Sequence, residues 1–198
     1  MAILNQLGIT STTGKAERIF EGMLNGESFF DIDYDCPKDY IRRLWTAYKT
    51  QNGNNQNLNG KIFEYIIYTL LYREKILPFY TQAKVAFVPN IEYDTILYSK
   101  SEPVSLSLKT SLRERYKQAD LEAIALKYVH RKAKCYLLTM DKQEASRTKS
   151  KIDCGDIIGL DKIIDCNTDD IDDLVKELKQ IQFCESINVD VVKGRLVK

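Results

Sequence analysis

The chain has 198 residues and a formal net charge of +1, because 29 basic side chains are balanced by 28 acidic ones. Its length suits one domain with its own core and is short for two. Its 44% hydrophobic and 29% charged residues are ordinary for a globular protein. These values exclude a disordered chain and a strongly basic type of nucleic-acid-binding protein.

The cysteine and histidine content argues against several kinds of metal and catalytic site. The five cysteines are scattered without a CxxC pair, which favours reduced thiols in a cytoplasm over a zinc site or a disulfide framework. His130 is the single histidine, so one chain cannot build a histidine-based triad or a multi-histidine metal site. The sequence has no signal-peptide pattern and no apolar run of membrane length, so we expect a cytoplasmic protein that does not bind a membrane.

Charge is uneven along the chain. Residues 109–134 carry eight basic side chains against three acidic ones, whereas residues 165–177 carry six acidic side chains against one basic. A basic stretch on a neutral protein fits a surface that binds phosphate groups, and it also fits an ordinary solvated helix. Charge alone favours the solvated helix.

The first third of the chain is predicted to be mostly helical. Apolar side chains recur at helical spacing in residues 15–24 and again in residues 37–49, which begin with a proline suited to a first turn. The polar, Asn- and Gly-rich residues 51–60 have no apolar period and predict a surface loop. Residues 61–74 are the most apolar helix candidate, and Glu64 lies within it.

The remainder alternates between strand-like and helix-like patterns. In chain order, we expect strands at 79–89, 93–99 and 104–110, a helix at 112–129, strands at 134–140 and 157–164, and a helix at 169–181. In residues 104–110 apolar side chains alternate with Ser105, Ser107 and Lys109, which predicts one buried face and one polar face. The pattern predicts an α/β fold with a mixed central β-sheet flanked by helices.

Four charged residues lie where a metal-dependent nuclease needs them. Asp94 begins one expected strand and Lys109 ends the next, while Glu122 lies in the following helix and Glu64 in the helix before the sheet. Two carboxylates suit a hard cation such as Mg²⁺, and a lysine offsets charge that builds on a phosphate. Each residue alone is also typical of a turn, a strand end or a solvated helix, although Glu64, inside an apolar helix, needs a partner.

Residues 105–122 resemble the active-site segment of the PD-(D/E)xK restriction endonucleases, and in particular their EcoRII-, SsoII- and PspGI-like (CCGG-type) branch. In that branch a small residue replaces the second acidic residue of the motif, and a glutamate from the following helix takes over its function. Here Ser107 stands two residues before Lys109, and Glu122 stands 13 residues after it, which is the spacing of the branch. The branch also carries a basic–acidic–arginine triplet followed by an aromatic residue, a basic residue and glutamine, and this chain has Arg113, Glu114, Arg115, Tyr116, Lys117 and Gln118.

The resemblance implies a role for each matching residue. Asp94 and Glu122 correspond to the metal-binding carboxylates, Lys109 to the catalytic lysine, and Glu64 to an additional active-site glutamate. Ser107 is the small residue of the motif and is counted with the catalytic group. The residue before Asp94 is tyrosine rather than the proline of the family pattern.

The triplet Arg113, Glu114 and Arg115, together with Lys117, is the expected DNA-recognition segment. An arginine can donate two hydrogen bonds to guanine and a carboxylate can accept one from cytosine, so the triplet suits G:C pairs. The alternative is a charged helix start, where arginines are unfavourable for the helix dipole. Trp45 and Tyr48 are candidates for stacking on flipped bases, although core packing is the favoured interpretation of both.

We expect a single nuclease domain over 1–198, because the length suits one domain. The resemblance covers about residues 60–140, the expected restriction-endonuclease-like catalytic core, which leaves an N-terminal helical part at 1–58 and a C-terminal part at 141–198. The expected function is that of a type II restriction endonuclease, a homodimer that cuts double-stranded DNA with Mg²⁺ at a short G:C-rich palindrome and works beside a cognate DNA methyltransferase. Two alternatives stay open, namely a repair or junction-resolving nuclease of the same family and a non-catalytic DNA-binding module.

Overall fold

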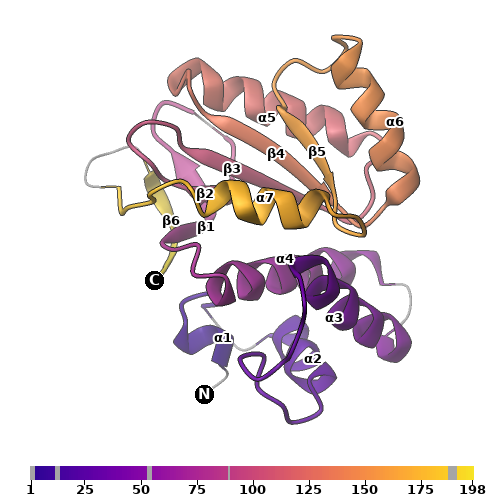
Figure 1. Cartoon of the computed structure of the whole chain (residues 1–198). Helices are drawn as coiled ribbons and strands as arrows, with labels where there is room; N and C mark the ends of the chain where they lie inside the picture. The colour runs from indigo at the N-terminus through magenta and orange to yellow at the C-terminus, as the bar shows by residue number, and fades with distance from the viewer. Residues whose placement is uncertain (1–2, 12–13, 53–54, 89, 187–190) are drawn as a thin grey trace.

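A computed structural model describes the chain except for residues 1–2, 12–13, 53–54, 89 and 187–190, and in it a mixed sheet is covered by helices on both faces (Figure 1). The six strands are β1 (Phe79–Val85), β2 (Tyr93–Leu97), β3 (Val104–Lys109), β4 (Lys134–Thr139), β5 (Lys162–Asp165) and β6 (Val191–Val197). They lie in the order β5-β4-β3-β2-β1-β6. The three strands β3, β4 and β5 are parallel, and the other neighbouring pairs are antiparallel. This confirms the predicted α/β class with a mixed central sheet.

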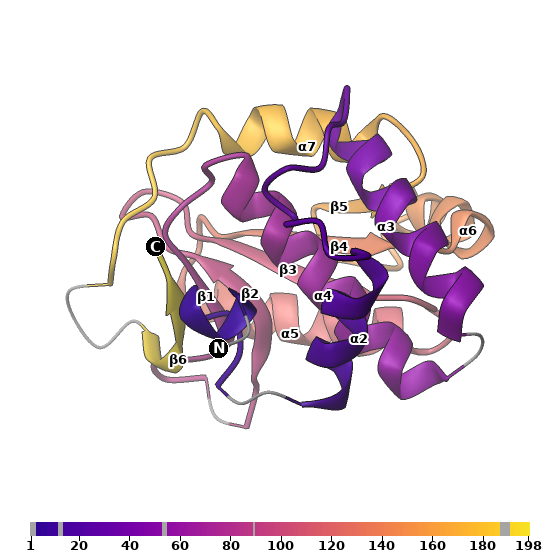
Figure 2. The ribbon, with the colours of Figure 1, turned by 90° about the horizontal axis from the view of Figure 1, so that it is seen from below.

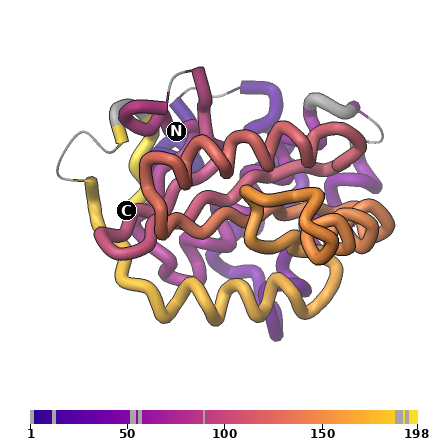
Figure 3. Tube along the Cα trace, turned by 90° about the horizontal axis from the view of Figure 1, so that it is seen from above, coloured from indigo at the N-terminus to yellow at the C-terminus, as the bar shows by residue number. Residues whose placement is uncertain are grey.

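The helices form one layer on each face of the sheet. They are α1 (Ile3–Gln6), α2 (Lys15–Met23), α3 (Pro37–Asn52), α4 (Gln56–Arg73), α5 (Arg115–Val129), α6 (Lys142–Asp153) and α7 (Asp170–Leu178). Apolar residues of α2, α3, α4 and α7 share one core with one face of the sheet, and seen from below α3 and α4 lie in front of it (Figure 2). Helices α5 and α6 cover the other face, as the view from above shows (Figure 3).

Both faces of β3 are covered, so the expectation of one buried and one polar face is wrong for part of this strand. Val104, Leu106 and Leu108 pack in the core shared with α4. Ser105, on the other face, is also buried, because α5 crosses that face between the parallel strands β3 and β4. The polar face of β3 is therefore covered by α5 at Ser105, whereas Ser107 and Lys109 stay partly exposed.

The prediction of a surface loop over residues 51–60 is wrong for most of this segment. Helix α3 continues to Asn52 and α4 already begins at Gln56, so the described part of this segment is mostly helical. Asn55 is the N-cap of α4, and its side chain accepts a hydrogen bond from the backbone N–H of Leu58 (3.2 Å). Asn59 accepts from the hydroxyl of Tyr48 (2.8 Å). The asparagines here cap and cross-link helices, which their composition alone does not reveal.

Other expected boundaries also shift. The helix expected from residue 112 begins at Arg115, and the strand expected over 157–164 is shorter and later, at Lys162–Asp165. Helices α1 and α6 and strand β6 have no counterpart among the expected elements. Strands β5 and β6 belong to the same sheet as β1 to β4, so the sheet extends beyond the expected catalytic core at 60–140.

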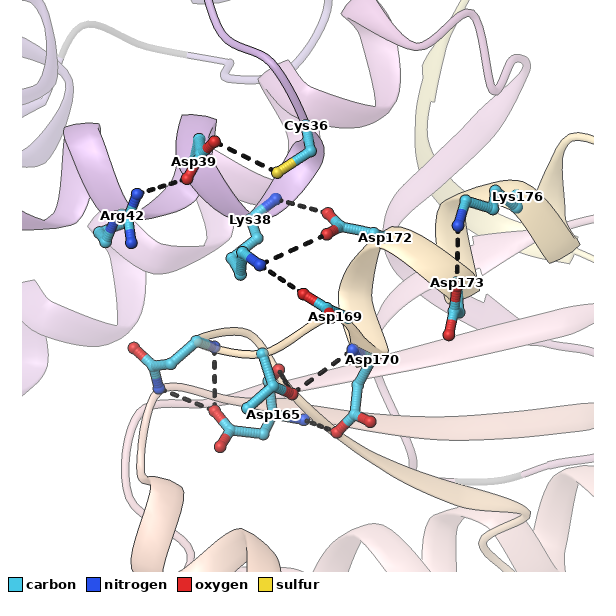
Figure 4. Close-up of polar contacts among 12 residues, drawn as sticks. Cys36, Lys38, Asp39, Arg42, Asp165, Asp169, Asp170, Asp172, Asp173 and Lys176 are labelled. Carbon is cyan, nitrogen blue, oxygen red and sulfur yellow. Dashed lines mark hydrogen bonds and ion pairs between the residues drawn. The ribbon is translucent and has the colours of Figure 1, made fainter.

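The acidic stretch 165–177 holds the start of α7 against neighbouring helices (Figure 4). The ammonium group of Lys38, at the start of α3, pairs with Asp169, and the carboxylate of Asp172 accepts the backbone N–H of Lys38 (2.8 Å). Asp170 pairs with Lys149 of α6 and accepts the backbone N–H of Asp165 (3.2 Å). The stretch therefore links both α3 and α6 to the start of α7.

Asp170 makes the stability of this region sensitive to acid. Burial raises the pKa of Asp170, but hydrogen bonds from Lys149 and from the backbone of Asp165 outweigh it and hold the pKa below its ordinary value of 3.8. Because the folded pKa is lowered, the stabilisation is present above pH 3.8 and is lost as the pH falls through the folded pKa. We expect urea denaturation of D170N to depend less on pH between 5 and 3 than that of the wild type, by at most about 1 kcal/mol. The control D156N changes an exposed aspartate and should follow the wild type, and equal pH dependence in D170N would contradict the assignment.

Candidate active site

Asp94 and Lys109 form an ion pair where β2 begins and β3 ends. The ammonium nitrogen of Lys109 lies 2.7 Å from Oδ2 of Asp94, and the two side chains are only 14% and 16% exposed. The same carboxylate oxygen accepts the backbone N–H of Leu108 (2.8 Å). Asp94 is thus held by one charged donor and one backbone donor, so its orientation is fixed.

The sheet register explains why these residues meet. Thr95 pairs with Leu106 in the antiparallel ladder, so continuing the register by one residue sets Asp94 opposite Ser107. Lys109 lies two residues further along β3 on the same face. Behind the strand, the hydroxyl of the buried Tyr68 in α4 donates to the backbone carbonyl of Asp94 (2.8 Å) and fixes the start of β2.

Glu122 faces the same hollow as Asp94. A small pocket between α5 and the sheet is lined by Asp94, Ser107 and Glu122, among other residues. Burial raises the pKa of Glu122, the hydrogen bond from Gln118 (2.7 Å) and the nearby Lys109 lower it, and the nearby Asp94 raises it. Asp94 and Glu122 therefore share one electrostatic environment, although they come from different elements.

Glu64 approaches this group from α4. Lys61 pairs with its carboxylate (2.8 Å), and the side-chain amide of Gln82 donates to the same oxygen (3.4 Å). Burial raises the pKa of Glu64, Lys61 lowers it, and Asp94 and Lys109 act on it in opposite directions. The partner that a carboxylate in so apolar a helix requires is therefore Lys61, three residues earlier on α4.

Gln82 is a site residue that the sequence analysis missed. Its backbone has a φ of 50°, and the pairing of β1 with β6 shifts register between Thr81 and Lys84. Such a bulge redirects a side chain out of the regular alternation of a strand. The only sequence signal is a polar residue within the strand-like segment 79–89, which is too common to single out.

The expected recognition segment lies beside this site, at the start of α5. Arg113, Glu114, Arg115 and Lys117 are all exposed, and Lys117 pairs with Glu114. The rest of the basic stretch does not join them: Lys127 pairs with Asp161 (2.9 Å), and residues 131–134 follow the opposite end of α5. The basic stretch is therefore divided, and only its first part lies in the connection between Lys109 and α5 and in the first turn of that helix.

Trp45 and Tyr48 belong to the helical layer of α3. Tyr48 is fully buried, and Trp45 packs edge-on against Phe63 with ring centroids 5.9 Å apart. Tyr48 lies inside the core and cannot stack on a base unless the core opens, whereas Trp45 is half-buried and packs against the edge of that core. The structure favours the core-packing interpretation of both residues.

The donor set fits a divalent cation held by two protein carboxylates. Among the described residues, no group of three or more His, Cys, Asp and Glu side chains is arranged to hold a metal. Asp94 and Glu122 nevertheless line one pocket, and within the described structure the buried hydroxyl of Ser107 beside them has no hydrogen-bond partner. Mg²⁺ is commonly bound by one or two carboxylates with water and phosphate oxygens as its remaining ligands. Asp94 and Glu122 would hold such an ion here.

Comparison with known proteins identifies no relative that could support or contradict this site. No protein-family model, curated protein or solved structure matches the chain. In the described residues, no helix is both long enough and apolar enough to span a membrane.

Proposed function

We propose that this protein is a Mg²⁺-dependent, site-specific DNA endonuclease of the PD-(D/E)xK type. The observation that carries the proposal is the convergence of Asp94, Lys109 and Glu122, which are separated in sequence, beside an exposed segment with two arginines. This combination would supply groups for phosphodiester hydrolysis and groups for base recognition along the consecutive elements β2, β3 and α5.

Each side chain has a task in this chemistry. Asp94 and Glu122 bind the cation, which when bound lowers the pKa of a water molecule and offsets charge on the phosphate. Lys109 lies against Asp94 and would hydrogen-bond a phosphate oxygen or the attacking water. Glu64 adds a third carboxylate to the electrostatic environment of the site.

The recognition segment explains how such an enzyme would select its site. Arg113 and Arg115 can each donate two hydrogen bonds to a guanine, and Glu114 can accept one from a cytosine amino group. A symmetric G:C-rich site calls for two copies of the chain, one for each half-site and strand, and we propose a homodimer. A cognate DNA methyltransferase is the expected partner in the cell, because an enzyme with this activity would otherwise cut its own genome.

Digestion of a long unmethylated DNA tests the activity directly. The purified protein should give discrete fragments with Mg²⁺ and none with EDTA, because the chelator removes the cation that Asp94 and Glu122 bind. Sequencing the fragment ends reads out the site. A smear would indicate a repair or junction nuclease without base readout, and intact DNA bound specifically would indicate a non-catalytic DNA-binding module.

Arg113 provides a test of base readout. R113A should lose about 1–3 kcal/mol of discrimination at one base position, because a bidentate contact to guanine is removed. The measurement compares the binding of the selected site with that of single-base variants at fixed salt, in Ca²⁺. A matched control is R131A, an exposed arginine beyond the far end of α5. An equal loss of affinity on every sequence would show that Arg113 contacts only phosphates.

A further inference from the structure

Helix α6 supports the segment that precedes α5. Oε2 of Glu144 accepts the backbone N–H groups of Leu112 (2.5 Å) and Arg113 (2.9 Å). Further along the same helix, the ammonium group of Lys151 donates to the hydroxyl of Tyr116 (2.9 Å). One helix, which the sequence analysis did not expect, therefore contacts the recognition segment at its beginning and again near its end.

The local sequence of α6 predicts a different role for Glu144. Asp141 is the N-cap and accepts the backbone N–H of Glu144 (3.0 Å), and a glutamate at this position commonly reaches back to the N-cap N–H to complete a capping box. Here that N–H donates instead to the hydroxyl of Thr139, at the end of β4 (3.1 Å). Thr139 thus takes the place of Glu144 at the helix start, and the glutamate is available to bind the neighbouring loop.

The loop that Glu144 holds has an unfavourable backbone. Arg113 has a φ of 28°, outside the regions that a non-glycine residue normally adopts, and such a conformation persists only where its surroundings enforce it. On one side, the side chain of Leu112 is fully buried in the core under α5. On the other side, the two hydrogen bonds to Glu144 fix the peptide groups that direct the Arg113 side chain outward.

We propose that Glu144 is a positioning residue that fixes the backbone of Arg113 and so sets how this arginine meets a base. The effect of Glu144 on DNA recognition rests on the proposed function. Its effect on the backbone of Leu112 and Arg113 does not. Because the carboxylate acts through the loop backbone, its reach matters more than its charge. A glutamine carbonyl has the same reach and can accept both N–H groups, whereas an aspartate keeps the charge but is one methylene shorter.

Three substitutions separate reach from charge. We expect E144Q to behave like the wild type within about threefold, and E144A and E144D to lose at least about tenfold in the protection of the Leu112 and Arg113 amides from hydrogen exchange. The exposed neighbour Gln143 provides the control Q143A, which should leave this protection unchanged. Amide exchange is measured without DNA and without activity. It therefore tests whether Glu144 stabilises the loop backbone even if the nuclease proposal fails. Unchanged protection in both E144A and E144D would overturn the proposal.

DNA binding then tests the consequence for recognition. E144D and E144A should lose discrimination at the base position that R113A identifies, by about tenfold, while their affinity for unrelated DNA stays within about threefold of the wild type. E144Q should restore discrimination. A loss in E144Q as large as in E144A would show that charge is what matters, and would overturn the positioning role. A wild-type protein that binds all sequences alike would instead remove the proposed function and, with it, the recognition part of this inference.

Discussion

Replacing Asp94 by asparagine should abolish DNA cleavage while leaving DNA binding intact. Asparagine keeps the shape of the side chain and an oxygen that can accept the Leu108 N–H, but it removes the negative charge that would bind the proposed cation. We expect the cleavage rate to fall by about 1000-fold or more, since removing one group that stabilises developing charge already costs about 100- to 1000-fold. Single-turnover cleavage of the selected site, with the protein in saturating excess over the DNA, measures this loss separately from binding.

The control for this substitution is E92Q. Glu92 is exposed and lies just before β2, so the change removes one negative charge from the same region without touching the Asp94–Lys109 pair. E92Q should cleave within about twofold of the wild type, because a single exposed charge has little effect on chemistry at a distance. If D94N cleaved within tenfold of the wild type, the site would have to be placed elsewhere.

Gly159 is the position where an added methyl group should destabilise the protein most clearly. A Cβ there would lie 2.4 Å from the backbone oxygen of Asp120 and 2.8 Å from Ile124, both on α5. The Gly159 N–H also donates to the Asp120 carboxylate (2.6 Å), so the loop cannot simply move away. We expect G159A to lower the free energy of unfolding by about 2–3 kcal/mol, as measured by urea denaturation. Glu122 lies on the same segment of α5, so cleavage should fall as well.

Gly22 offers the same chemical change in a different setting. It lies within α2, and an added Cβ there would meet no atom within 4 Å. G22A should stabilise the protein by about 0.5–1 kcal/mol, because alanine loses less conformational entropy than glycine in a helix. A G159A protein as stable as the wild type would mean that the loop before β5 does not pack on α5 as closely as described.

The parts of the fold that could be predicted are those with strong apolar periodicity. The segments around β2, β3 and α4 carry many large apolar side chains, so their periods are visible in the sequence. The alternation in β3 also predicts that Ser107 and Lys109 share a face, and the register of the sheet adds Asp94 to it. Asp94 and Glu122 come together because α5 covers that face of the sheet. Periodicity alone does not indicate which face a helix covers.

The elements that escaped prediction are those with few apolar residues or with unusual backbone. In α6 the buried residues are Ala145 and Thr148, so the helix has no apolar stripe to reveal it. The start of α5 is displaced to Arg115 because Leu112 enters the core and Glu144 holds the preceding backbone. These features depend on contacts between distant segments, and no local pattern encodes them.

The short connection between β3 and α5 has a geometric consequence for the proposed enzyme. Lys109, which would act at the scissile phosphate, and Arg113, which would read a base, are joined by four peptide units, and these span at most about 14 Å. Successive base pairs are about 3.4 Å apart. The connection therefore limits the distance between the cut phosphate and the base that Arg113 would read to a few base pairs. The cut would fall within or next to the pairs that are read, and an insertion in this connection would shift the cleavage position while the recognised sequence stayed the same.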